Sequence, residues 1–192
     1  MMEGLDAERA RLFALLGRLL AAPPDIELLA RLAALQGDDT PLGRGIAGLA
    51  RAAAEAQPAA LEREFFELFI GVGRGELLPY ASYYLTGFLH ERPLADLRGD
   101  LRRLGVERAP GVPEPEDHIA FECETLSGLI AGSFPAAGPE EAGAFFARHM
   151  RPWAGRFFAD LEGASTARFY RAVGALGRTA IEIELAAAEL PP

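Results

Sequence analysis

Three side chains able to do chemistry, Asp117, His118 and Glu122, lie in the stretch 116-EDHIAFECETL-126. His118 and Glu122 are four residues apart, so on a helix they share one face, and this spacing can bring two metal ligands together. A zinc site needs further ligands, and the chain offers only one cysteine, two other histidines and distant acids. This shortage disfavours a metal site, but a small metal-dependent hydrolase that uses His118 and Glu122 stays open as an alternative.

The same stretch also has a structural interpretation. Pro115 can occupy the first turn of a helix, and Glu116 and Asp117 then favour its positive N-terminus. His118 would hold the preceding proline-rich segment in place. The single cysteine, Cys123, falls inside the predicted helix, where a buried thiol is usually inert.

A glycine loop, 71-GVGRG-75, follows a helix that the apolar spacing predicts to end near Leu68 and Phe69. A phosphate-binding loop needs a preceding strand and a Lys-Ser or Lys-Thr pair, whereas Glu-Leu follows here. The sequence therefore favours a structural role, in which Gly71 ends the helix as a left-handed cap and Gly73 turns the chain.

An aromatic cluster comes directly after this loop, at Pro79, Tyr80, Ser82 and Tyr84. Tyrosine rings combine apolar faces with a polar tip, which suits a peptide-binding surface. They are equally suited to a core in which each hydroxyl has a hydrogen-bond partner. Both interpretations remain open from the residues alone.

In a third stretch, 145-FFARHMRPWAGRFFADL-161, His149, Trp153 and Phe157 recur at four-residue spacing. We interpret this face as core packing against a neighbouring helix. Pro152 is expected to kink or restart the helix.

The elements that carry these stretches are all predicted to be helices. Apolar stripes begin in the first twenty residues and recur through residues 26–35, 61–69, 94–104 and 169–183, and prolines separate several of them. No run alternates apolar and polar residues, so the predicted fold is all-α, a helical bundle in a single domain, 1–192. The proline-rich segment 109–116 is the predicted linker between an N-terminal half, 1–108, and a C-terminal half, 117–192. Exchange through it would give a domain-swapped dimer beside the monomer.

Composition narrows the function classes. Half of the 192 residues are hydrophobic, yet no apolar run reaches the roughly 18 residues of a membrane span. The net charge of −9 disfavours nucleic acid as a partner. A lone cysteine and an N-terminus that reads as a first helix predict a cytoplasmic protein.

In the order and spacing of these three stretches, the sequence resembles the TorD/DmsD family of redox-enzyme maturation chaperones. The first match is Leu-Phe, a glycine turn and Pro-aromatic-x-Ser-x-aromatic. The second is Asp-His-Ile-x-x-Glu after a proline-bearing linker, and the third is His-x-x-Pro-Trp-x-x-x-Phe. The resemblance runs from about residue 10 to about residue 185. Departures such as Val72, where the family often has proline, affect the apolar lining and leave the client's identity open.

The resemblance implies an all-helical chaperone without catalytic turnover or an obligatory cofactor, although GTP binding has been proposed in the family. It implies binding of the twin-arginine signal peptide and the apo-precursor of a molybdenum-cofactor enzyme, held until the cofactor is inserted. A scaffold that bridges the client to cofactor-synthesis proteins is a further alternative. The residues implied in client binding are Leu68, Phe69, Gly71, Gly73, Pro79, Tyr80, Ser82, Tyr84, Glu116, Asp117, His118 and Glu122.

The residue chemistry suits such a client. A twin-arginine signal presents two guanidinium groups followed by an apolar segment, and guanidinium pairs with carboxylates in a fork geometry. Glu116, Asp117 and Glu122, together with Glu76, are the acids that we expect to receive it. The leucines and aromatic rings of the loop are expected to receive the apolar segment.

Overall fold

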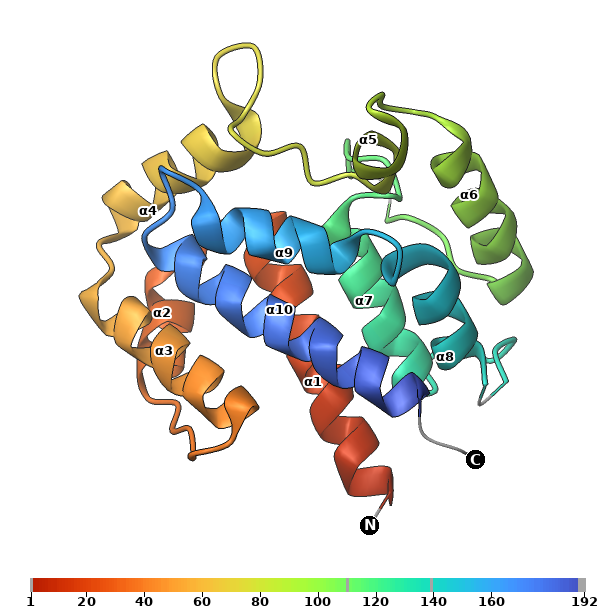
Figure 1. The fold of residues 1–192 in the computed structure, drawn as a ribbon, viewed down its shortest axis with the longest axis horizontal. Coiled ribbons are helices and arrows are strands. Elements are labelled where there is room, and N and C mark those ends of the chain that lie inside the picture. The colour runs from red at the N-terminus through yellow and green to blue at the C-terminus, as the bar shows by residue number, and fades with distance from the viewer. Residues whose placement is uncertain (1, 110, 139, 190–192) are drawn as a thin grey trace. The chain divides into compact units, whose positions relative to one another are not determined.

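A computed structural model describes residues 2–109, 111–138 and 140–189, and these residues form an all-helical protein (Figure 1). No strand occurs among them, so the predicted fold class is confirmed. Pro110, inside the predicted linker, lies outside the described residues. The elements are α1 (Met2–Ala21), α2 (Ile26–Ala33), α3 (Pro41–Glu55), α4 (Pro58–Phe65), the π-helix η1 (Phe66–Ile70), α5 (Ala81–Thr86), α6 (Arg92–Leu104), α7 (Ile119–Ile130), α8 (Glu141–Phe145), the π-helix η2 (Phe146–Met150), α9 (Ala154–Gly163) and α10 (Phe169–Ala188).

The chain divides into two compact units, and each is assembled from two separate segments. Unit 1 comprises Met1–Ala21 and Pro79–Trp153, and unit 2 comprises Ala22–Leu78 and Ala154–Pro192. This division differs from the predicted halves, because both units contain chain from either side of residues 109–116.

Unit 1 is organised around the contact between α1 and α7, which lie side by side (Figure 1). Ser127 on α7 donates a hydrogen bond from its Oγ to the carbonyl of Ala10 on α1, at 2.7 Å. Gly17 lets the helices approach, since a Cβ there would lie 3.0 Å from the carbonyl oxygen of Ala120. The α5 and α6 helices contact each other, and α7 also contacts α8 and η2.

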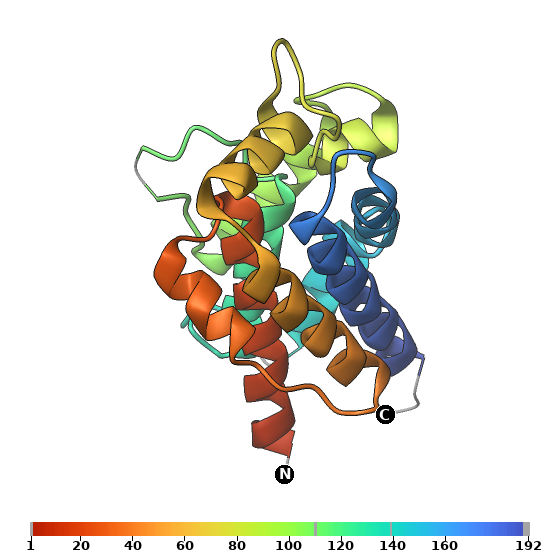
Figure 2. The same cartoon turned by 90° about the vertical axis from the view of Figure 1, so that its left-hand side faces the viewer.

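Unit 2 is built on α10, which contacts α9, α3 and α4; α3 and α10 lie side by side in Figure 2. The buried Glu64 of α4 accepts hydrogen bonds from the first free N–H groups of α10, at Arg168 (2.8 Å), Phe169 (3.3 Å) and Tyr170 (2.8 Å). A carboxylate suits the positive end of a helix, so Glu64 fixes where α10 begins.

Two expectations about local structure were wrong. The helix carrying Glu122 starts at Ile119, with His118 as its N-cap, and not at Pro115. The reason is that His118 has an extended backbone and forms an antiparallel bridge with Tyr80. Gly71 ends η1 with φ 61° and ψ 175°, which is a positive φ but not the left-handed helical cap that we expected.

The prediction for Pro152 is confirmed, because the chain leaves η2 at Met150 and restarts as α9 at Ala154. His149, Trp153 and Phe157 are therefore not one continuous helical face. All three are buried, as predicted for core packing.

Candidate functional site

The aromatic cluster of the first sequence motif and the Asp-His residues of the second motif contact each other in unit 1. The Ala81 N–H donates to the carbonyl of Asp117, and the Ile119 N–H donates to the carbonyl of Pro79, both at 2.9 Å. These two bonds flank the bridge between Tyr80 and His118. We call this arrangement the Tyr80–His118 junction. Tyr80 is the N-cap of α5 and His118 is the N-cap of α7, so the bridge joins the starts of two helices that are nearly forty residues apart in the chain.

Asp117 is the buried centre of the junction. Its side chain is 1% exposed, and Oδ2 accepts hydrogen bonds from the Ser82 N–H (2.9 Å) and the Ser82 hydroxyl. Ser82 is itself fully buried in the first turn of α5. The other oxygen, Oδ1, is buried without a partner among the described residues. Asp117 therefore fixes the start of α5 and is not presented to solvent.

His118 is also held within the junction. Its Nδ1 accepts a hydrogen bond from the Ala120 N–H at 3.1 Å, and its ring meets the Tyr80 ring edge-on at 5.1 Å. Burial lowers the pKa of His118 to about 4, although the Glu114 and Asp117 carboxylates act in the opposite direction. The imidazole is consequently neutral near pH 7.

Tyr80 connects the junction to the surface. It is half-buried, and its hydroxyl donates to the exposed carboxylate of Glu114. Burial and this carboxylate together raise the pKa of Tyr80. The phenol therefore remains a hydrogen-bond donor at any physiological pH, and it holds Glu114 at the edge of the junction.

Glu122 lies one turn into α7 and is fully buried. Its Oε2 accepts a hydrogen bond from the indole Nε1 of Trp153 at 3.1 Å, while Oε1 has no partner in the described part of the chain. Burial and the nearby charge of Asp117 raise the pKa of Glu122 well above its ordinary value. Tyr84 packs its ring against Trp153, with centroids 5.4 Å apart.

These contacts bear on the metal interpretation of His118 and Glu122. The described residues contain no group of three or more His, Cys, Asp or Glu side chains that could hold a metal ion. Burial raises the pKa of Cys123 well above its ordinary value, so this thiol is poorly suited to be a nucleophile.

The glycine loop belongs to unit 2 and rises beyond the end of α4 (Figure 1). Leu68 is buried, and Phe69 packs edge-on against Tyr170, with centroids 5.4 Å apart. Gly71 and Gly73 both have positive φ, and a Cβ on Gly71 would lie 2.0 Å from the Arg74 carbonyl oxygen. The loop therefore depends on glycine at its first position.

Glu76 closes this loop and is not a free acid. Its carboxylate accepts hydrogen bonds from Ser165 N–H (2.7 Å), Ser165 Oγ (2.9 Å) and Thr166 N–H (3.1 Å). The chain between α9 and α10 is thereby fixed within unit 2. Of the four acids that we expected to receive guanidinium, Asp117 and Glu122 are buried, Glu76 is exposed but holds a turn, and Glu116 is partly buried.

Sequence reasoning missed several residues that the structure makes conspicuous. Glu114 was not a candidate, although its carboxylate meets Tyr80. In unit 2, Phe66, Ile70 and Val72 expose 41%, 54% and 98% of their surface on η1 and the glycine loop. A π-helix changes which side chains face outward, and no period of 3.6 residues predicts that change.

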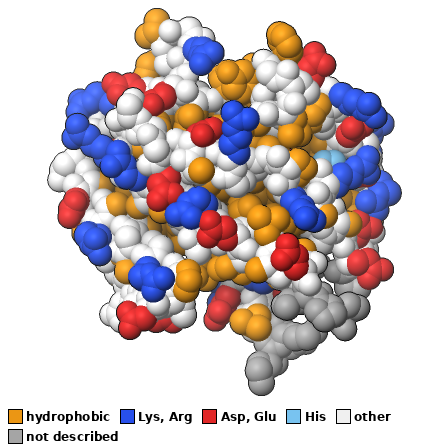
Figure 3. Space-filling view, viewed as in Figure 1, with side chains coloured by type: hydrophobic (Ala, Val, Ile, Leu, Met, Phe, Trp, Pro, Cys, Tyr) orange, Lys and Arg blue, Asp and Glu red, His pale blue; other side chains and the backbone are white. Residues whose placement is uncertain are grey.

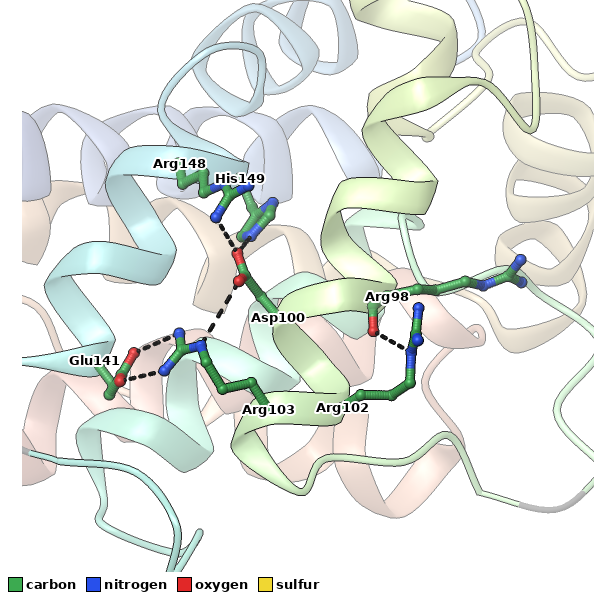
Figure 4. A network of polar contacts seen from close by, with 7 residues as sticks. All are labelled: Arg98, Asp100, Arg102, Arg103, Glu141, Arg148 and His149. Atoms are coloured by element: carbon green, nitrogen blue, oxygen red, sulfur yellow. Dashed lines mark hydrogen bonds and ion pairs between the residues drawn. The ribbon is translucent and has the colours of Figure 1, made fainter.

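A second polar cluster in unit 1 joins α6 to α8 and η2 (Figure 4). Oδ2 of Asp100 is hydrogen-bonded to His149 Nε2 at 2.8 Å and forms an ion pair with Arg148 Nη1 at 2.9 Å. Arg103 forks onto both oxygens of Glu141, at 2.5 and 3.0 Å. Burial lowers the pKa of His149 despite the opposing effect of its hydrogen bond to Asp100. The cluster ties three helices together and explains His149 as a structural residue.

Comparison with known sequences decides the family. The family model described as "nitrate reductase delta subunit" matches residues 35–159, well over half of the chain. The chain belongs to this family. The TorD-like resemblance of the three motifs is thereby confirmed.

Curated relatives of this family member are named "Chaperone protein TorD". The protein from Aliivibrio salmonicida is 31% identical over 134 residues, which is 65% of this chain and 62% of the relative. That from Vibrio atlanticus is 30% identical over 125 residues, 60% of this chain and 58% of the relative. The chain thus spans about three fifths of the length of these curated relatives.

A solved structure shares the fold. The chain matches a proposed redox enzyme maturation protein from Archaeoglobus fulgidus with a TM-score of 0.63 and 23% identity, over 91% of this chain and 93% of the other. No helix in the described part of the chain is long and apolar enough to cross a bilayer. On the face shown in Figure 3, acidic and basic side chains of the described residues are interspersed.

Proposed function

We propose that this member of the TorD-like family is a chaperone and not an enzyme. Its client is the apo-precursor of a molybdenum-cofactor oxidoreductase, bound through its twin-arginine signal peptide and held in the cytoplasm until the cofactor is inserted. The observation that carries the proposal is the Tyr80–His118 junction, which joins two of the three family motifs through backbone and side-chain hydrogen bonds.

The junction suggests separate roles for the motif residues. Ser82, Asp117, His118 and Glu122 are buried and partnered, so we assign them to holding the starts of α5 and α7. The surface next to them presents Glu114 and Glu116. Those carboxylates are the proposed contacts for the arginines of the signal peptide, because a guanidinium group needs an accessible acceptor.

The glycine loop is proposed as a separate contact for the apolar segment of a client. Val72 exposes nearly its whole surface at the tip, and Ile70 and Phe66 expose large apolar areas on η1. We propose that these side chains, which lie within seven consecutive residues, form an interaction surface. Leu68 is buried on the same π-helix, and the positive φ of Gly71 turns the chain towards Val72.

The metal-dependent hydrolase is the less favoured alternative. His118 already uses Nδ1 to accept a backbone hydrogen bond, and Glu122 is fully buried and accepts a hydrogen bond from Trp153. Metal analysis of tag-free protein distinguishes the two functions: stoichiometric zinc or iron that is lost in the His118→Ala variant would favour the hydrolase.

The chaperone proposal is tested by co-purification with molybdoenzyme precursors from the same organism. Full-length apo-precursor and a version lacking its leader are compared at equal expression. Retention of only the leader-bearing form supports signal-peptide recognition. Equal retention of both supports the scaffold that bridges client and cofactor-synthesis proteins, and retention of neither contradicts both.

Residues 109–116 remain predicted to permit domain-swapped dimers beside monomers, which light scattering over a concentration series tests.

A further inference from the structure

Two arginines of the chain itself already occupy the surface segment beside the junction. In unit 1, Arg98 of α6 places Nε at 2.8 Å and Nη2 at 2.7 Å from Oε2 of Glu116. Arg108 donates from Nη1 to the carbonyl of Glu114 at 2.6 Å and, more weakly, to that of Pro113 at 3.4 Å. A stretch of four residues, 113–116, therefore binds two guanidinium groups.

The contact with Arg98 is open to exchange. The Arg98 side chain is 46% exposed, whereas that of Glu116 is 15% exposed. Both Arg98 nitrogens contact the same carboxylate oxygen, so the pair is not the two-oxygen fork that arginine forms in its strongest contacts. Partly exposed ion pairs contribute little to stability. A guanidinium group from another molecule could replace Arg98 without unfolding anything.

The surroundings favour a second cation. Burial acts to raise the pKa of Glu116, but the Arg98 hydrogen bond, a backbone hydrogen bond and the charges of Arg98 and Arg108 together lower it, so the carboxylate is ionised near pH 7. The next residue, Asp117, has a buried Oδ1 without a partner in the described part of the chain. Glu114 adds an exposed carboxylate that Tyr80 holds in place.

We propose that Glu116 receives a guanidinium group of the client's signal peptide, and that Arg98 is an internal competitor that must be displaced first. Arg108 is a positioning residue, since it donates hydrogen bonds to backbone carbonyls of the segment. This inference rests on the proposed function and adds a specificity determinant to it. Arg98 thereby selects among ligands: the ammonium group of a lysine does not displace it from Glu116, whereas the planar guanidinium group of an arginine does.

Arg102 provides a matched control on the same helix. It is exposed and donates only to the backbone carbonyl of Arg98, at 3.1 Å. In Figure 4 the Arg98 side chain extends away from Asp100, so its removal leaves the cluster that joins α6 to η2 untouched. Arg98→Gln and Arg102→Gln change the net charge equally, which removes long-range attraction as an explanation of any difference.

The test is fluorescence anisotropy with a labelled leader peptide carrying Arg-Arg. Arg98→Gln should tighten binding about 1.4- to 5-fold relative to Arg102→Gln, which is the coupling of an exposed ion pair expressed as a ratio of dissociation constants. In the Glu116→Gln background, removal of Arg98 should give no gain. Arg98→Lys, which keeps the charge but loses one of the two nitrogen contacts with Glu116 Oε2, should fall between wild type and Arg98→Gln. Matching thermal midpoints confirm that each variant is folded.

Each outcome separates the inference from the proposed function. If wild type binds and Arg98→Gln equals Arg102→Gln, the competitor role is overturned while signal-peptide binding stands. If only Arg98→Gln binds, the competitor role is supported in its strongest form. If neither wild type nor any variant binds the peptide, the proposed function and this inference both fail.

Discussion

Replacing Asp117 should destabilise the protein before it affects any client. The carboxylate is 1% exposed and accepts two hydrogen bonds from Ser82. A hydrogen bond to a charged group contributes about 1.5–3 kcal/mol, and its loss leaves a buried donor unsatisfied. Asp117→Ala should therefore lower the free energy of unfolding by about 3–6 kcal/mol. Asp117→Asn keeps one acceptor oxygen and should cost roughly half as much.

Urea unfolding followed by far-UV circular dichroism measures this difference. Asp6→Ala is the control in the same unit, since Asp6 forms an exposed pair with Arg9 and should cost less than about 1 kcal/mol. If Asp117→Ala costs no more than Asp6→Ala, the carboxylate does not hold the start of α5 and the assignment of Asp117 as a buried structural residue is wrong. The outcome also decides how a binding defect of Asp117→Ala is to be understood.

Two further predictions concern the buried acid of α7 and the glycine loop. Because the pKa of Glu122 is raised in the folded protein, its stabilising contribution is complete below the ordinary value of 4.5 and is lost as pH rises. Glu122→Gln keeps an acceptor for Trp153, so its stability relative to wild type should increase between pH 4.5 and 8 in urea titrations; a difference independent of pH would contradict the raised pKa. Gly71→Ala should cost about 2–3 kcal/mol, since a Cβ there meets a carbonyl oxygen at 2.0 Å, whereas Gly73→Ala has open space and should cost only about 1 kcal/mol. Equal thermal midpoints for the two variants would refute the strained position of Gly71.

The helices could be predicted from the sequence because their cause is local. Apolar stripes at helical spacing must be buried on one face, and Pro58 and Pro93 stand in the first turns of α4 and α6, where proline is tolerated. The predicted start of α7, at Pro115, was wrong by several residues, because the helix begins at Ile119. It is fixed by the bridge between Tyr80 and His118, and a contact across 38 positions leaves no trace in local spacing.

The sequence predicted which acidic residues belong to the candidate site, but it did not predict which of them are buried and which can reach a ligand. Asp117 and Glu122 have the chemistry to bind a guanidinium group, yet Ser82 and Trp153 occupy them, 35 and 31 positions away in the chain. Whether an acid is exposed depends on such partners, so the sequence alone could not separate Glu116 from its buried neighbours. The same limit applies to Glu114, whose contact with Tyr80 spans 34 positions.

Calorimetric titration of the wild-type protein with the twin-arginine leader peptide of a molybdoenzyme from the same organism tests the chaperone function most directly. The peptide is compared with an Arg-Arg→Lys-Lys version of identical length and charge. Micromolar or tighter binding that weakens about tenfold or more with lysine is the predicted result, because ammonium cannot reproduce the guanidinium fork. Equal binding of the two peptides would contradict guanidinium recognition, and no binding of either would contradict signal-peptide recognition itself.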